Sequence, residues 1–503
     1  MLSFAPFQPY IHDNQRGRHM NEVKLLIGGK DVDAAGGKTF ERKSPITGKV
    51  MVRAAAASAA DARAAVEAAA AAFPAWSALG PNARRKFLLE AAAKLRAKSA
   101  DFSRLGVEET GAIPGWGHFN TAFAATLLEE AAALTTQVSG ETIPSDQPGT
   151  LALGLRQPAG VVVGMAPWNA PVILGVRAIA VPLAVGNTVV LKASELSPAT
   201  HRLIVDAFVE AGLPAGTVNF ISHAAADAPA VVEALISHPA TRRVNFTGSS
   251  RVGRIIGELS GKYLKPCLLE LGGKAPLVVL EDADLDQAVA AAAFGAFMHQ
   301  GQICMSTERI IVVDQVYDAF MKKFIAKAKS LPVGDPTTGN FPIGACVDTK
   351  TVDHVKALIS DATGKGGKVA TGGQGSGGAF FEPTVIEGVT QDMRIYGEES
   401  FGPIVGVIRA RDLDDAVRLA NDCEYGLSAA VFSQDINKAL GVAQRIDSGI
   451  CHINSPTVQD EAQMPFGGTK SSGLGRFGGR AGIAEFTDLR WISVATQPRH
   501  YPI

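Results

Sequence analysis

The sequence predicts an α/β protein built on doubly wound parallel sheets. From residue 160 onward, short β-branched runs alternate with stretches of helical length, and strands that alternate with crossover helices form parallel sheets. The chain also holds 53 glycines, which suit many tight strand–helix turns. Its 503 residues, 47% of them hydrophobic, exceed one ordinary core, so we expect two or more domains.

The first elements precede this alternation. Ser58 and Asp61 resemble a capping box and predict a helix in the alanine-rich segment 54–75. Helical periodicity predicts a second helix over 81–105. A polar, turn-rich segment at 137–149 then leads into 150–157, where apolar and polar residues alternate as in a strand.

The alternation itself assigns the following elements. Strands are expected at 160–165, 187–193, 217–222, 243–246 and 266–271. Helices are expected at 171–185, 198–211, 227–237 and 250–259. Doubly wound sheets bind ligands at the carboxyl ends of their strands, so these ends are where a site is expected.

A second alternation begins with a strand at 276–280. Asp284 is expected to cap a helix that runs through His299 and delivers the chain to a loop containing Cys304. The glycine-rich segment 361–378 predicts an exposed turn region. Residues 1–19 lack the apolar core of a secretory signal, and we interpret them as a flexible arm.

Charge and cysteine content exclude several classes of protein. Lysine plus arginine number 48 and aspartate plus glutamate 49, so no global charge favours nucleic acid or an anionic membrane. No apolar run reaches about 18 residues, so no spanning helix is expected. The five cysteines include no C-x-x-C pair, so we predict no disulfide framework, no metal site and a reducing cytoplasmic location.

Cys304 and Glu270 are the candidate reactive pair. A thiolate can attack a carbonyl carbon, and a carboxylate can take a proton from the water that releases the adduct. Gly301 and Gln302 suggest an exposed loop around Cys304, whereas the usual alternative is a buried structural cysteine. Glu270 ends a strand that is predicted to be buried, where a carboxylate is costly unless it is paired or functional. The alternative to a functional role is an ion pair at the strand end.

Two further strand ends carry polar or small residues. The side-chain amide of Asn169 is able to donate to an oxyanion, together with the backbone N–H of Cys304, although an asparagine in a turn is the common alternative. The turn from Gly248 to Gly253 follows a strand and opens a helix, where backbone N–H groups can approach a pyrophosphate. Many α/β turns look alike, so this signal alone is weak.

Seven segments in chain order add a more specific signal. They are Pro167-Trp168-Asn169, Lys192-Ala193-Ser194-Glu195, Phe246-Thr247-Gly248-Ser249, Leu269-Glu270-Leu271-Gly272-Gly273-Lys274, Gly301-Gln302-Ile303-Cys304, Glu398-Glu399-Ser400-Phe401-Gly402-Pro403 and Pro465-Phe466-Gly467-Gly468. Together they resemble the signatures of the aldehyde dehydrogenase superfamily, over about residues 23–491.

The resemblance implies an architecture and a set of catalytic roles. It implies a cofactor domain (20–138 and 160–271), a catalytic domain (272–477) and a small β oligomerisation arm (139–159 and 478–497), in a homodimer or homotetramer. Cys304 would be the nucleophile, Glu270 the general base and Asn169 the oxyanion donor. The presence of Glu270 favours release of an acid over transfer to coenzyme A, which stays open as an alternative.

The resemblance also implies a nicotinamide cofactor. The residues that would bind it are Pro167, Trp168, Lys192, Ser194, Glu195, Gly248, Ser249, Gly253, Leu271, Glu399 and Phe401. A carboxylate at Glu195 would bind ribose hydroxyls and repel a 2′-phosphate, which predicts NAD, with NADP possible. A solvated turn at Lys192 and Glu195 is the plain alternative.

The segments 165–177 and 301–306 are more similar to salicylaldehyde, vanillin and benzaldehyde dehydrogenases than to betaine-aldehyde or succinate-semialdehyde types. An aromatic aldehyde substrate is therefore expected, with Arg177 and Ile303 near it. Arg177 in an interdomain ion pair is the alternative. An aliphatic substrate, and a structural protein that has kept the fold without catalysis, also stay open.

Overall fold

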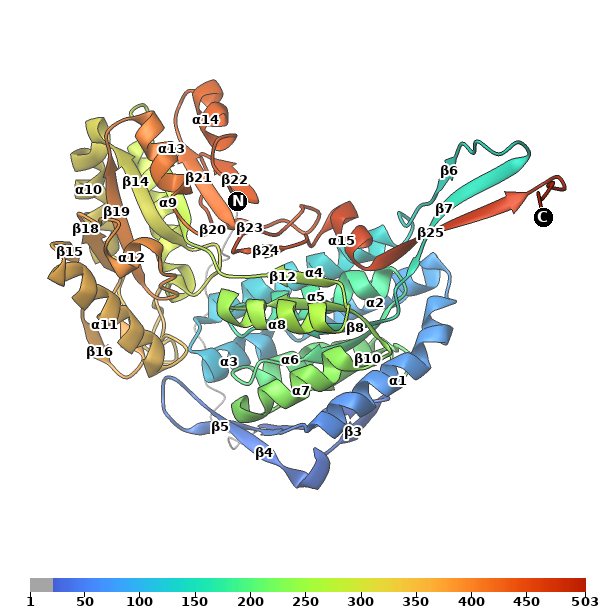
Figure 1. The fold of residues 1–503 in the computed structure, drawn as a ribbon. Coiled ribbons are helices and arrows are strands. Elements are labelled where there is room, and N and C mark those ends of the chain that lie inside the picture. Colours follow the sequence, from blue (N-terminus) through green and yellow to red (C-terminus); the bar gives the residue numbers. More distant parts are fainter. Residues whose placement is uncertain (1–20) are drawn as a thin grey trace.

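The structure is a computed structural model that describes residues 21–503. The flexible arm predicted for residues 1–19 therefore lies outside the described residues. Two large parallel sheets with helices on both faces make up most of the molecule, and a narrow three-stranded sheet projects from it (Figure 1). No helix in the described part of the chain is both long and apolar enough to cross a membrane.

The first sheet has eight strands in the order β24-β12-β11-β8-β9-β10-β2-β3. Its central strands β8 to β12 are parallel, whereas β2, β3 and β24 pair antiparallel at the edges. The bounds are β2 Leu25–Ile27, β3 Lys30–Val32, β8 Val161–Met165, β9 Thr188–Lys192, β10 Val218–Ile221, β11 Thr241–Thr247, β12 Cys267–Glu270 and β24 Gly473–Leu474.

Alternate side chains of these strands enter two different cores. Val161 and Val163 of β8 pack with helices α1, α7 and α8, whereas Val162 packs with helices α2 to α6 on the other face. The helices are α1 Ala59–Ser77, α2 Pro81–Ala97, α3 Ser99–Thr110, α4 Pro114–Leu134, α5 Pro171–Ala184, α6 Pro198–Glu210, α7 Ala228–Ser237 and α8 Ser250–Lys262. This double covering is the predicted doubly wound arrangement.

The second sheet has seven strands in the order β15-β18-β19-β14-β13-β21-β22, all parallel except β15. The bounds are β13 Ala275–Val279, β14 Thr307–Val313, β15 Lys368–Thr371, β18 Thr384–Glu387, β19 Ile404–Ala410, β21 Ser428–Phe432 and β22 Ile450–Ile453. One core includes α9 (Leu285–Phe297) and α10 (Asp314–Lys329). The other includes α11 (Thr349–Gly364), α13 (Leu413–Asn421) and α14 (Ile436–Ala443).

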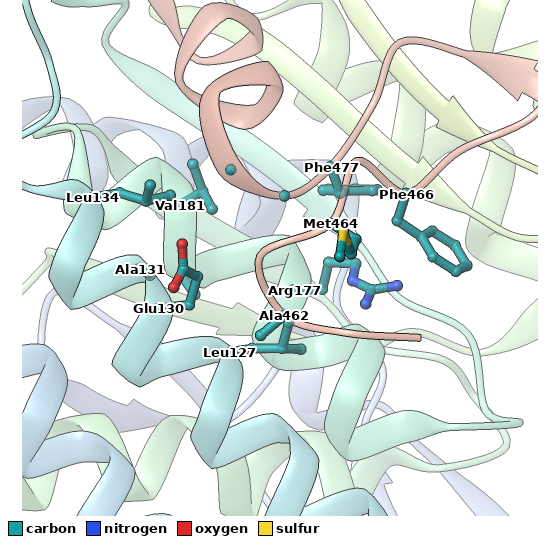
Figure 2. A pocket seen from close by; sticks show the side chains of 13 residues that line it. Leu127, Glu130, Ala131, Leu134, Arg177, Val181, Ala462, Met464, Phe466 and Phe477 are labelled. Atoms are coloured by element: carbon teal, nitrogen blue, oxygen red, sulfur yellow. The ribbon is translucent and has the colours of Figure 1, made fainter. Parts of the chain in front are cut away.

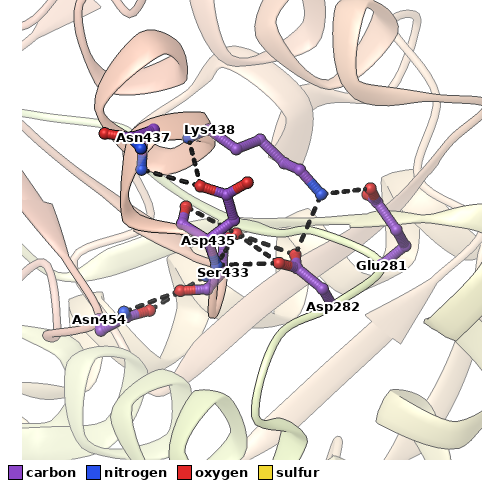
Figure 3. Close-up of polar contacts among 7 residues, drawn as sticks. All are labelled: Glu281, Asp282, Ser433, Asp435, Asn437, Lys438 and Asn454. Atoms are coloured by element: carbon purple, nitrogen blue, oxygen red, sulfur yellow. Dashed lines mark hydrogen bonds and ion pairs between the residues drawn. The ribbon is translucent and has the colours of Figure 1, made fainter.

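A polar cluster ties two strand ends of this second sheet together (Figure 3). The Asp282 carboxylate, just beyond β13, accepts hydrogen bonds from Ser433 Oγ at 2.9 Å and from the Asp435 backbone at 3.0 Å, just beyond β21. Lys438 also pairs with Glu281 at 2.7 Å. Cys304 precedes the parallel strand β14, so the cluster lies at the opposite end of the sheet from the thiol loop.

Small sheets complete the chain. The projecting sheet contains β6 (Glu141–Ile143), β7 (Thr150–Pro158) and β25 (Thr487–Ala495) in the order β25-β7-β6 (Figure 1). Another sheet joins β1 (Asn21–Val23), β5 (Val50–Ala55) and β4 (Thr39–Lys43). The remaining short elements are η1 Ala35–Gly37, η2 Ala225–Asp227, η3 Met298–Gly301, β16 Gly375–Gly377, β17 Phe380–Phe381, α12 Arg394–Gly397, β20 Tyr425–Gly426, β23 Thr469–Lys470 and α15 Gly479–Glu485.

Most predicted elements are present, and the capping box of Ser58 and Asp61 is formed in both directions. Three predictions need correction. The single helix over 81–105 is wrong, because Lys98 leaves helical geometry and separates α2 from α3. The helix predicted to run through His299 ends at Phe297, because Met298 leaves helical geometry with ψ of 133°. The segment 361–378, predicted as an exposed turn, also contains the end of α11 and the strands β15 and β16, because Gly364 still belongs to α11 and Gly375 and Gly377 belong to β16.

Candidate active site

Cys304 lies in a tightly built loop between η3 and β14, and its own side chain is partly buried. The exposed loop predicted around it is wrong, because Gln302 is fully buried and its carbonyl Oε1 accepts the backbone N–H of Val347 at 2.9 Å. The loop also packs closely on its neighbours: a Cβ on Gly273 would lie 2.4 Å from the Cys304 carbonyl oxygen. The thiol is therefore held by a rigid, buried backbone.

Glu270 ends β12, and its side chain is buried with 1% of its surface exposed. Neither carboxylate oxygen has a conventional hydrogen-bond partner among residues 21–503, and no ion pair forms there, so the structure gives no strand-end ion pair. Burial raises the pKa of Glu270 to about 8, against the lowering effects of Arg177 and of a contact with the Cys304 thiol. A carboxyl group with this pKa can take up a proton near neutral pH.

The Cys304 thiol has a pKa well above its ordinary value. Burial is the largest cause, and the negative charges of Glu270 and Glu399 add to it, whereas Arg177 opposes it. The thiol and the Glu270 carboxyl contact each other, so a negative charge on one of them disfavours a negative charge on the other. Burial and the neighbouring carboxylates therefore favour the thiol over the thiolate in this arrangement.

Asn169 follows β8 and is buried beside the thiol loop. Its amide Nδ2 donates to the Gln302 backbone carbonyl at 3.0 Å, which fixes the plane of the amide and leaves its second proton free. Its own backbone carbonyl accepts the Trp116 indole N–H at 2.9 Å. The amide is therefore a fixed donor on the loop that carries the thiol, and not a loosely held turn residue.

Two cavities meet at Cys304 and Asn169, which line both of them. The smaller cavity has a volume of about 270 Å³, and it gathers many of the residues predicted to bind a cofactor. It is lined by Pro167, Trp168, Asn169, Leu174, Thr247, Gly248, Ser249, Glu270, Gly272, Cys304, Glu399 and Phe401. Helix α8 begins beside this cavity, and Ser249 caps its N-terminus by accepting the Val252 N–H at 3.4 Å.

The walls of this cavity fit a dinucleotide. The N-terminus of α8 at the cavity wall favours a pyrophosphate, and glycine at 248 leaves backbone open to it. Gly253 allows α8 to pack on Leu271, because a Cβ there would lie 2.3 Å from the leucine side chain. Glu399 accepts the Gly273 N–H at 3.0 Å, and burial raises the pKa of its carboxyl to about 8.

Five of the predicted cofactor residues do not line this cavity: Gly253 and Leu271, which pack against each other, and three residues at the end of β9. Lys192, Ser194 and Glu195 are at the carboxyl end of β9, the strand next to β8, and they do not line this cavity. Burial lowers the pKa of Lys192, and the charge of Glu195 opposes this. The backbone N–H of Ser194 donates to His201 Nδ1 at 3.2 Å, which orders the turn that carries them.

The larger cavity has a volume of about 530 Å³ and mainly apolar walls. It includes Ile303 and Arg177, the two residues expected near a substrate, and Ile173 and Met305 from the segments 165–177 and 301–306. It also includes residues that the sequence did not single out, namely Trp116, Phe119, Phe123, Phe294, Met298, Val458, Asp460 and Glu461. Their segments lie far apart in the chain, so no local pattern brings them together.

Arg177 lies at the wall of the larger cavity and also forms an ion pair. Its partner is Asp460, whose Oδ2 lies 2.5 Å from Nη2. Its guanidinium lies 4.4 Å from the centre of the Phe466 ring, a cation–π contact. Figure 2 shows Arg177 beside Phe466, Phe477 and Met464, at the wall of a further small cavity under α15. The arginine therefore links α5 to the C-terminal segment that carries Asp460 and Phe466.

Comparison with known proteins identifies the family. A profile of the "Aldehyde dehydrogenase family" matches residues 32–492. The chain is 59% identical to a vanillin dehydrogenase of Pseudomonas fluorescens, over 96% of this chain and 100% of that protein. It is 37% identical to an NAD(+) benzaldehyde dehydrogenase of Pseudomonas putida, over 94% and 96%.

Solved structures agree with this match. The crystal structure of a salicylaldehyde dehydrogenase from Pseudomonas putida G7, complexed with salicylaldehyde, superposes with a TM-score of 0.94 at 48% identity, over 96% of this chain and 100% of that one. The predicted α/β class and the predicted family are thereby confirmed. This chain belongs to the aldehyde dehydrogenase family.

Proposed function

We propose that the protein oxidises an aromatic aldehyde to the carboxylic acid with NAD as the hydride acceptor. The observation that carries this proposal is the position of Cys304 at the junction of two cavities. One cavity holds features that suit a dinucleotide, and the other is large and mainly apolar. A thiol at their junction can hold a substrate carbon against a nicotinamide ring.

The side chains supply a covalent route. Once the thiol has lost its proton to water, Cys304 Sγ bonds to the carbonyl carbon, and the carbonyl π electrons move to oxygen, which gives a thiohemiacetal anion. The Asn169 amide and the Cys304 backbone N–H then stabilise the negative oxygen. When bound, the nicotinamide supplies the hydride acceptor that the protein side chains lack.

The acyl group then remains on Sγ as a thioester. Glu270 accepts a proton from water, the water oxygen bonds to the acyl carbon, and the C–S bond breaks to release the acid. The buried position and raised pKa of Glu270 support this role. The same carboxyl favours hydrolysis over transfer to coenzyme A, and product analysis with and without coenzyme A tests this.

Family members use NAD or NADP, and Glu195 supports NAD here. Its carboxylate follows β9, where it would meet the adenosine ribose and repel a 2′-phosphate. We assign Lys192, Ser194 and Glu195 to the adenosine end, and Glu399 and Phe401 to the nicotinamide end. A higher kcat/KM with NADP than with NAD would contradict the assignment.

The larger cavity supports an aromatic substrate. Trp116, Phe119 and Phe123 can stack on a ring, and the Arg177–Asp460 pair offers a polar group for a ring hydroxyl. The relatives named vanillin, salicylaldehyde and benzaldehyde dehydrogenase point to the same class. A panel of aldehydes, followed by NADH absorbance, tests it. Higher kcat/KM for aliphatic aldehydes than for hydroxylated benzaldehydes would refute it.

We infer further that the chain is a homodimer or homotetramer joined through the projecting sheet. Its strands expose Leu489 and Trp491, with 64% and 76% of their surfaces accessible, and its outer edges offer unpaired backbone groups. We also assign cofactor binding to 20–138 and 160–271, catalysis to 272–477 and assembly to 139–159 and 478–497. The five free thiols suit the reducing cytoplasm.

A further inference from the structure

A buried ion pair beside the candidate active site has no part in the chemistry above. Lys274 Nζ lies 2.7 Å from Glu308 Oε2, and the exposed fractions of the two side chains are 0% and 4%. Burying two charges costs hydration energy that their attraction does not reliably recover, so such a pair is weak evidence for stability alone. Its other hydrogen bonds indicate what the pair organises.

Those hydrogen bonds go to the loop that follows Glu399. The second oxygen of Glu308 accepts the backbone N–H groups of Ser400 at 2.9 Å and Phe401 at 3.2 Å. Lys274 Nζ also donates to Ser400 Oγ at 3.2 Å. One carboxylate therefore binds two consecutive amides, and its partner lysine binds the side chain between them.

The loop adopts a conformation that needs such support. Phe401 has φ of 45°, in the left-handed region that is unfavourable for a residue with a side chain. A strained conformation persists only where surrounding contacts determine it. The Phe401 ring meets Trp168 edge to face with centroids 5.7 Å apart, so the strained backbone aims the ring at the wall of the smaller cavity.

The pair also connects the loop to the thiol. Glu308 is the second residue of β14, which follows the Cys304 loop. Lys274 directly precedes β13 and follows Gly273, whose backbone N–H donates to Glu399. Gly301 packs against the same loop, because a Cβ there would lie 2.2 Å from the Gly402 carbonyl oxygen. The thiol loop and the Glu399–Phe401 loop are therefore fixed to each other through this pair.

We propose that Lys274 and Glu308 are positioning residues that hold Glu399 and Phe401 against the nicotinamide end of the cofactor. The inference rests on the proposed use of NAD. Neither residue lines the cavity, so both act through the loop and not by touching the cofactor. Loss of the Glu308 carboxylate would leave two backbone N–H groups of the strained loop without their acceptor. The nicotinamide would then be aligned less firmly with the substrate carbon.

The test compares variants at Glu308 with the wild-type protein. Glu308→Ala removes the acceptor, and we expect Kd for NAD to rise at least tenfold. With a benzaldehyde deuterated at its aldehyde carbon, we expect the isotope effect on kcat to rise by at least half, because hydride transfer becomes slower. The double variant Lys274→Met with Glu308→Gln removes both charges but keeps an acceptor for the two amides, so NAD binding should recover to within threefold of wild type.

Asp415→Asn is the matched control. Asp415 is also a buried carboxylate, bound by the side chains of Arg411 and Arg418 and by the Arg411 backbone N–H, but it belongs to α13. This variant should lower Tm while leaving Kd for NAD and the isotope effect unchanged. Glu308→Asp, which keeps the charge but shortens the reach, serves if Glu308→Ala does not fold, and its Kd for NAD should rise at least threefold.

Each failure has its own signature. The positioning role would be overturned if a folded Glu308→Ala protein had the wild-type Kd for NAD and the wild-type isotope effect. If the alanine variant does not fold, a wild-type Kd for NAD in Glu308→Asp would overturn it. No recovery in the double variant would overturn the acceptor argument. If the wild-type and Asp415→Asn proteins themselves neither bind NAD nor form NADH from benzaldehyde, the proposed function fails instead.

Discussion

Replacing Glu270 with glutamine should separate the two halves of the reaction. Glutamine keeps the shape of the side chain but cannot take a proton from water. Aldehyde attack and NADH formation should proceed once per site, and the thioester should then accumulate. Because a positioned general base contributes about 10²–10⁴-fold, steady-state turnover should fall by that factor while a stoichiometric NADH burst remains. Stopped-flow absorbance measures both phases.

The pKa of Glu270 gives the pH dependence of the hydrolysis phase. With a pKa of about 8, roughly a tenth of the carboxyl is ionised at pH 7 and roughly nine tenths at pH 9. Thioester hydrolysis after the burst should therefore accelerate about tenfold between these pH values in the wild-type protein. The glutamine variant should lack this rise.

The same carboxyl should affect stability. Burial makes the folded chain bind this proton more tightly than the unfolded chain, so the free energy of unfolding falls as pH rises from about 4.5 to about 8. That difference corresponds to about 5 kcal/mol, as an upper estimate. Glu270→Gln should thus raise Tm more at pH 9 than at pH 5.

A Glu270→Gln protein with wild-type turnover, or with the wild-type rise of the hydrolysis rate with pH, would refute the assignment of Glu270 as the base.

Three further replacements test the rest of the site. Cys304→Ala should abolish the NADH burst while leaving NAD binding intact, and a retained burst would exclude the thiol as nucleophile. Asn169→Ala should lower kcat by about 10²–10³ with little change in Kd for NAD, and an unchanged kcat would remove it from the oxyanion site. Asp460→Asn should lower kcat/KM about tenfold for hydroxylated benzaldehydes and less than threefold for benzaldehyde, and equal losses would show that the carboxylate does not recognise the hydroxyl.

The catalytic and cofactor candidates could be found from the sequence because they lie on contiguous strand–turn segments. Glu270 ends a short apolar run, and Gly248 and Ser249 precede a helix directly after a strand. Such local patterns can be recognised in the sequence without knowledge of tertiary contacts. The alternation of strands and helices predicted the sheet class for the same reason.

The residues that escaped prediction come together only through packing. Asp460 reaches Arg177 from a segment almost 300 positions away, and Trp116 reaches the same cavity from α4. Gln302 looked exposed because glycine and glutamine are common in loops, but the loop folds inward to bind Val347. Neither the length of a helix nor the burial of a loop follows from composition when a distant partner decides it.

The two-residue strand β24 joins the C-terminal part of the chain to the strand that ends at Glu270. Gly473 pairs with Glu270, and Ser472 accepts the Leu271 N–H with its carbonyl and donates to the Gly272 carbonyl with its hydroxyl. Shortening the protein before residue 473 would thus strip away the hydrogen-bonded edge beside Glu270, although Glu270, Cys304 and Asn169 would all still be encoded. Truncations intended to remove only the projecting sheet should accordingly retain the chain at least through Leu474.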